Sequence, residues 1–101
     1  MIGRLWRGWT APERAGVYVE YLRGTGVKEL RETPGNQGVL VLHRTHGGRE
    51  EFFVLSLWES LEAVKGFAGE DVQVARFYPE DDDFLVDREW TCSHYEVPIG
   101  P

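Results

Sequence analysis

The chain has 101 residues and a mass of 11.6 kDa, so we expect a single domain spanning residues 1–101 rather than two independent cores. Hydrophobic residues make up 42% and charged residues 28% of the chain, a globular composition that excludes disordered and fibrous proteins. The net charge of −6 repels phosphate backbones and anionic lipid. We therefore expect no nucleic acid and no membrane as partners.

The cysteine content and the N-terminal residues predict a cytoplasmic protein. The single cysteine, Cys92, has no partner for an internal disulfide. The first seven residues lack the apolar stretch of a signal peptide, and the longest nearly apolar run, Phe52–Trp58, is too short to span a bilayer.

The N-terminal third predicts a strand followed by a helix. Residues 2–9 are rich in aromatic and β-compatible side chains, and Thr10-Ala11-Pro12-Glu13 matches a capping box that opens a helix. Apolar residues then recur with helical spacing at Ala15, Tyr18, Val19 and Leu22. Gly24 and Gly26 end this helix, with a short continuation at 27–30.

The middle of the chain predicts a β-hairpin. Residues 37–46 and 49–58 flank Gly47-Gly48, a two-residue loop that tolerates the positive φ angles of tight hairpin turns. The loop sets a register in which Leu42 faces Phe53 and Arg44 faces Glu51 as an opposite-charge pair.

The remaining segments complete a βαββαβ-like order. Ser60 is expected to cap a helix that ends near Gly69, followed by a strand at 72–78, a polar loop or single helical turn at 79–83 and a last strand at 89–97. This order predicts an α+β ferredoxin-like sandwich, an antiparallel sheet with helices on one face.

The hairpin is apolar on both faces, although an antiparallel sheet with one solvated face alternates apolar and polar residues. Two short helices cover one face only, so we expect a homodimer packed sheet against sheet. The alternative is a longer loop folded over the second face.

The sequence predicts no metal site. His43 and His46 are three residues apart on a strand and point to opposite faces, so they cannot share an ion. Residues 80–83 lack the ligand spacing and the glycine of a calcium loop.

A small-molecule pocket is the main functional candidate. The four tryptophans pack in a core or an interface by default. The alternative is a pocket that holds a flat apolar ligand, with polar contacts drawn from Arg4, Arg76, His43, His94 and Tyr78.

The chain resembles the antibiotic biosynthesis monooxygenase-like family of the dimeric α/β-barrel superfamily. The resemblance covers nearly the whole chain and is carried by the segments 33–38, 55–60, 67–71, 78–82 and 94–97. It implies a ferredoxin-like protomer, a homodimer forming a dimeric α/β barrel, and a pocket between helices and sheet. Relatives in this family oxygenate electron-rich phenols or anthrones, or degrade haem, without a metal or flavin held by the protein.

The departures from the haem-degrading branch disfavour that activity, because residues 70–77 contain no histidine and the first strand lacks that branch's Asn. The hypothesis is a cofactor-independent monooxygenase for a flat aromatic or quinol-type molecule. His43 or His94 would be the base, Arg4 the anion stabiliser, Trp6 and Trp58 the walls, and Arg76 and Tyr78 further contacts. A dimeric small-molecule-binding or stress-related protein without catalysis is the alternative, and a purely structural dimer with no pocket is a third possibility.

Overall fold

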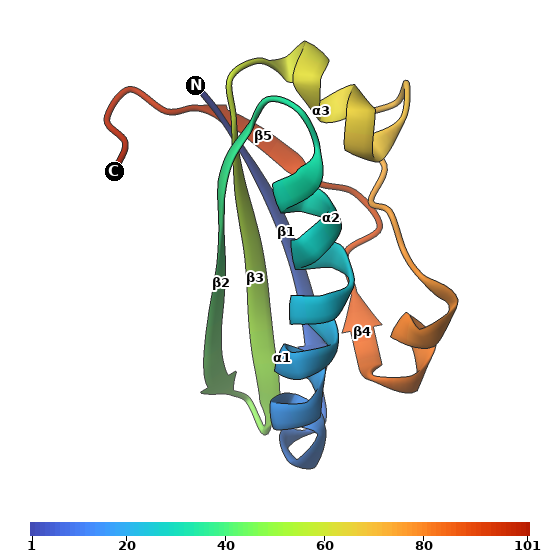
Figure 1. Cartoon of the computed structure of the whole chain (residues 1–101). Helices are drawn as coiled ribbons and strands as arrows, with labels where there is room; N and C mark the ends of the chain where they lie inside the picture. The colour runs from blue at the N-terminus through green and yellow to red at the C-terminus, as the bar shows by residue number, and fades with distance from the viewer.

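The computed structural model describes all residues from 1 to 101. Its elements follow one another in the order β1 (Ile2–Thr10), η1 (Pro12–Arg14), α1 (Ala15–Gly24), α2 (Gly26–Glu32), β2 (Asn36–His46), β3 (Arg49–Trp58), α3 (Leu61–Ala68), η2 (Pro79–Asp83), β4 (Leu85–Arg88) and β5 (Ser93–Glu96). The predicted α+β ferredoxin-like fold is confirmed, with helices α1 and α2 lying against an antiparallel sheet (Figure 1).

The sheet has five strands in the order β2-β3-β1, with both short C-terminal strands paired to the free edge of β1. β5 pairs with the first half of β1 and β4 with its last residues. The hairpin register is as predicted: Leu42 lies opposite Phe53, and Arg44 donates from Nε to Glu51 Oε1 at 2.8 Å.

The core lies between the helices and one face of the sheet. Tyr18 of α1 packs edge-on against Phe52 of β3 with ring centroids 4.9 Å apart, and both side chains are buried. Ser60 caps α3 as predicted, because its Oγ accepts from the Ala63 amide at 3.1 Å. The helical stripe at 15, 18, 19 and 22 faces this core.

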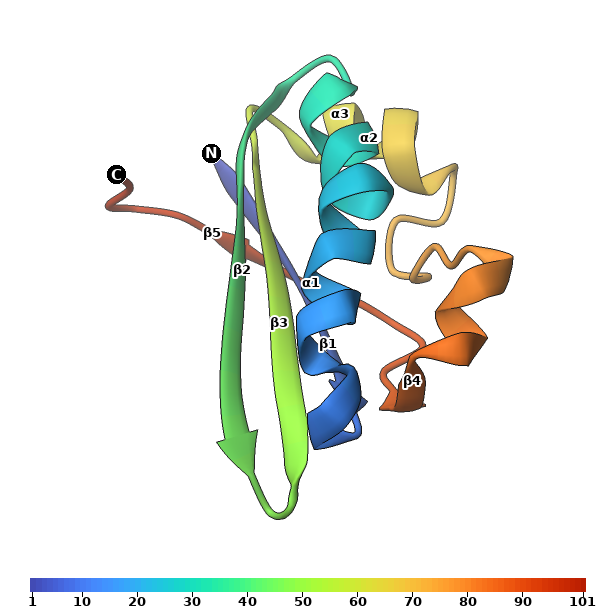
Figure 2. The ribbon, with the colours of Figure 1, turned by 60° about the horizontal axis from the view of Figure 1, so that its bottom comes forward.

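The other face of the sheet carries no helix (Figure 2). Leu40 and Leu42 on β2 are 49% and 48% exposed, and Tyr95 on β5 is 56% exposed. The chain after β5 reaches only one end of this face, where Val97 lies close to Gly3. We call this surface the open face. No long loop folds over the open face, which was the alternative to a dimer.

Three local predictions were wrong. Thr10 does not cap the first helix, since its hydroxyl donates to the Ala11 carbonyl and β1 continues through this residue. Residues 72–78 form no strand, because β4 and β5 occupy the edge of β1 and leave one isolated bridge, Val74 to Thr91. The last predicted strand is shortened to β5, and β4 precedes it.

None of the helices is both long enough and apolar enough to cross a membrane.

Candidate functional site

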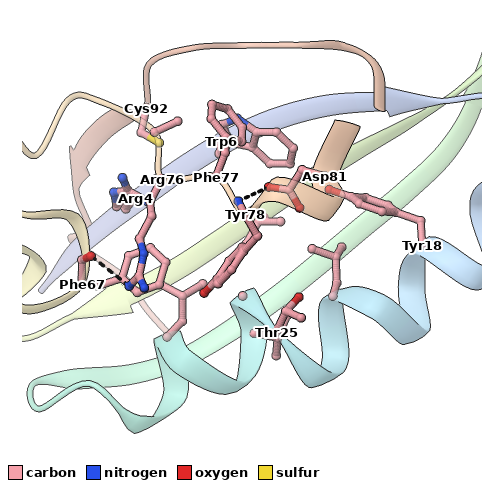
Figure 3. Close-up of a pocket in the computed structure, with 16 residues that line it drawn as sticks. Arg4, Trp6, Tyr18, Thr25, Phe67, Arg76, Phe77, Tyr78, Asp81 and Cys92 are labelled. Atoms are coloured by element: carbon pink, nitrogen blue, oxygen red, sulfur yellow. Dashed lines mark hydrogen bonds between the residues drawn. The ribbon is translucent and has the colours of Figure 1, made fainter. Parts of the chain in front are cut away.

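A pocket opens between the helix-covered face of the sheet, helices α1 and α2, and the segment 75–81 (Figure 3). Its cavity volume is about 60 Å³, and the pocket opens to solvent. Eleven of the sixteen lining residues are hydrophobic, and the polar ones lie among aromatic rings. An apolar cavity with a few polar groups is the usual form of a small-molecule site.

Strand β1 places Arg4 and Trp6 on the same face, two residues apart, and both line the pocket. The Arg4 side chain is buried, with the residue only 5% exposed. Its Nη2 donates to the Val74 carbonyl at 3.2 Å, whereas its Nε is buried and has no hydrogen-bond partner. Burial lowers the pKa of Arg4, but an arginine stays charged under all ordinary conditions.

No carboxylate lies within ion-pair distance of Arg4, although the molecule forms ten ion pairs between other arginine or lysine side chains and carboxylates. Buried charges in proteins are normally paired, because removing an ion from water is costly. Arg4 is therefore a buried cation whose counter-charge the fold does not supply, and the pocket is positive at this end.

Arg76 brings a second guanidinium to the same end of the pocket, and this one is paired. Its Nη2 lies 2.8 Å from Glu29 Oε2, and its Nη1 donates to the Phe67 carbonyl at 3.3 Å. The guanidinium carbons of Arg4 and Arg76 lie 5.7 and 4.9 Å from the centre of the Phe67 ring. Both cations thus contact one aromatic ring, but the positive charge of Arg4 alone is left free.

Aromatic side chains form the middle of the pocket. Trp6 is fixed by a hydrogen bond from Nε1 to the Glu89 carbonyl at 2.7 Å and meets Phe77 edge-on at 6.0 Å. Burial and the nearby Glu29 carboxylate raise the pKa of the Tyr78 hydroxyl. The Nε of Arg4 is therefore the buried donor at this end of the pocket that no protein acceptor satisfies.

Asp81 is a lining residue that the sequence interpretation missed, because the acids at 80–83 were expected to be solvated, although the helical turn there was anticipated. It is 6% exposed. Its Oδ1 accepts from the Tyr21 hydroxyl at 2.7 Å and its Oδ2 from the Tyr78 amide at 2.8 Å. The available signal was an acidic residue at the third position of a helical turn begun by Pro79, where a carboxylate folds back onto the chain.

The three predicted residues His43, His94 and Trp58 do not line the pocket. His43 pairs with Glu50 at 2.8 Å, stacks on Phe52 and faces a separate groove beside β2. His43 therefore does not reach this pocket. Trp58 is fully buried in the core around α3, with Nε1 donating to Ser56 Oγ at 2.8 Å, so it is no pocket wall.

His94 lies next to the pocket rather than in it. Pairing of β1 with β5 sets it directly opposite Arg4, and its buried Nε2 has no partner. Burial and the positive charge of Arg4 lower the pKa of His94, which favours the neutral imidazole. Cys92 lines the pocket, but burial raises its pKa and keeps it a thiol.

Comparisons with known proteins support the fold. No family model matches the chain, and no curated protein matches it. Among solved structures, a Bacillus cereus protein provisionally classed as an antibiotic biosynthesis monooxygenase has 21% identity and a TM-score of 0.69, with 100% of this chain and 94% of that one covered.

The haem degrader MhuD from Mycobacterium tuberculosis, with two haems bound in its active site, has 22% identity and a TM-score of 0.61 over 100% of this chain and 99% of its own. A point mutant of MhuD, with two manganese protoporphyrins bound per active site, has 22% identity and a TM-score of 0.62, with 100% of this chain and 98% of that one covered. The resemblance inferred from the sequence is thus confirmed at the level of the fold.

The pocket residues do not fit the iron of a bound haem. No histidine is among the lining residues, and burial holds the Cys92 thiol and the Tyr78 hydroxyl in their protonated forms. Haem iron in proteins is usually held by an imidazole, a thiolate or a phenolate. The pocket therefore offers no protein ligand to haem iron.

Proposed function

We propose that this protein is a cofactor-independent monooxygenase acting on a flat aromatic molecule of the quinol type. The observation that supports this most is the buried, unpaired guanidinium of Arg4 at one end of an aromatic pocket. Such a site favours a ring with an anionic oxygen over the neutral form of the same ring.

The chemistry follows from stabilising that anion. A deprotonated hydroquinone can itself transfer an electron to O₂, so the protein has to lower the pKa of the substrate hydroxyl and exclude water. In this proposal Arg4 holds the oxyanion, and Trp6 and Phe77 contact the ring. His94 lies beside the pocket, opposite Arg4 on the neighbouring strand, and its unprotonated imidazole would receive the proton that the hydroxyl loses through one bridging water.

Oxygen uptake with a panel of anthrones and hydroquinones tests the proposal. We expect the wild-type protein to consume O₂ and Arg4→Met to lose most of the rate, with a smaller loss in His94→Ala. His46→Ala, at the exposed end of the hairpin, is the control variant. Equal rates in the wild type, Arg4→Met and His94→Ala would remove the enzyme proposal.

One observation favours a second candidate, a small-molecule-binding protein without catalysis: none of the three histidines lines the pocket. A binder needs the anion-stabilising end and the aromatic walls but no base. Saturable binding of a quinol-type ligand without any oxygen uptake would favour this candidate.

We also propose that the protein is a cytoplasmic homodimer joined through the open face. Leu40 and Leu42 on β2 and Tyr95 on β5 are large apolar side chains exposed on this face, and exposed apolar surface usually marks an interface. A second copy related by a twofold axis would cover it with the same residues. Analytical ultracentrifugation across a wide range of dilutions tests this state.

A further inference from the structure

The far end of the pocket holds a charge of the opposite sign. Arg4 and Asp81 lie at opposite ends of the pocket, with Phe77 and Tyr78 between them (Figure 3). Asp81 is as buried as Arg4 and, like Arg4, has no ion-pair partner. The pocket is therefore polarised along its length, with a donor end and an acceptor end.

The Asp81 carboxylate has capacity for another hydrogen bond. Each of its oxygens accepts one, from the Tyr21 hydroxyl and from the Tyr78 amide. A carboxylate has about four acceptor positions, so two remain open. Its neighbouring cation, Arg88, is engaged instead by Asp82.

We propose that Asp81 determines specificity by accepting a hydrogen bond from a hydroxyl group at the end of the ligand opposite its anionic oxygen. The ligand class is then a flat ring system with an oxyanion at one end and a hydroxyl donor at the other. This inference rests on the proposed function, since it takes the anion to lie at Arg4. A site built to bind a hydroxyl discriminates strongly against the analogue that lacks it, because the buried acceptor is left with an unfilled position.

Calorimetric titration with two probes tests the proposal: a naphthoate, and a hydroxynaphthoate with its hydroxyl on the ring remote from the carboxylate. The carboxylate stands for the substrate oxyanion. We expect the wild type to bind the hydroxynaphthoate about tenfold or more tightly than the naphthoate, since hydrogen bonds to charged groups are among the stronger ones.

Asp81→Asn keeps the side-chain shape and an oxygen that can accept from the Tyr78 amide, but it removes the charge. We expect this variant to lose most of the preference for the hydroxynaphthoate and to keep its affinity for the naphthoate. Tyr21→Phe is the matched control, because it removes one hydrogen bond to Asp81 from outside the pocket and should keep the preference.

The outcomes separate the two proposals. An unchanged preference in Asp81→Asn, or equal binding of both probes by the wild type, would overturn the role of Asp81 even where naphthoate binding depends on Arg4. Naphthoate binding that is absent, or the same in Arg4→Met, would instead contradict the proposed function. If Asp81→Asn does not fold, Asp81→Ser replaces it with the same expected loss of preference, and equal binding of both probes by the wild type still overturns the role of Asp81.

Discussion

Replacing Arg4 by methionine should stabilise the unliganded protein while removing its affinity for anions. Methionine fills a similar volume and carries no charge. The effective cost of burying one ion is several kcal/mol, and the fold provides no carboxylate to offset it. The substitution also removes the hydrogen bond from Arg4 to the Val74 carbonyl, which is worth about 1.5–3 kcal/mol for a charged donor.

The difference between these terms predicts a net stabilisation of about 1–2 kcal/mol. For a domain of this size, each kcal/mol raises the melting temperature by about 4–8 °C. Thermal unfolding followed by circular dichroism measures the shift. Arg76→Met is the matched control: its guanidinium already has an acidic partner in Glu29, so we expect a loss of about 0–1 kcal/mol.

A melting temperature that falls in Arg4→Met by as much as, or more than, it falls in Arg76→Met would refute the reasoning. Such a fall would mean that contacts other than ion pairs already stabilise the charge of Arg4. A ligand anion would then not be needed to neutralise it.

Three further predictions concern the open face, a helix cap and pH. Leu42→Asp on the open face should convert the proposed dimer to monomers in analytical ultracentrifugation, whereas an unchanged sedimentation coefficient would exclude this face as the interface. Ser60→Ala removes the acceptor for the Ala63 amide and should cost about 0.5–2 kcal/mol in urea unfolding. The pKa of His94 is lowered in the folded state, so the unfolded chain binds the proton more readily, and stability should fall as pH drops below 6.5. The stability of His94→Gln should decline less steeply over the same pH range. An equal decline in both proteins would exclude His94 as the cause of the pH dependence.

The hairpin could be predicted residue by residue, because a two-residue glycine loop and a period of two leave one register that pairs Arg44 with Glu51. The same period places Arg4 and Trp6 on one face of β1, which is why both were candidates for one site. Ser60 was predictable because its hydroxyl acts within the same helical turn.

Features that depend on contacts distant in the chain could not be predicted. Residues 72–78 alternate as a strand does, but β4 and β5 occupy the only free edge of β1. Trp58 and Trp6 are both aromatic residues on strands facing the helices, yet packing buries Trp58 completely under α3 and leaves Trp6 beside the cavity. Asp81 looked like one of four solvated acids until the fold brought Tyr21 against it.

The charge of Arg4 gives the most direct test of the account. Titrating the wild type and Arg4→Met with a naphthoate and with the uncharged naphthamide of the same shape isolates the contribution of that charge. The account predicts that the wild type prefers the naphthoate by about tenfold or more, and that Arg4→Met loses this preference. Equal affinity of the wild type for both compounds would contradict it.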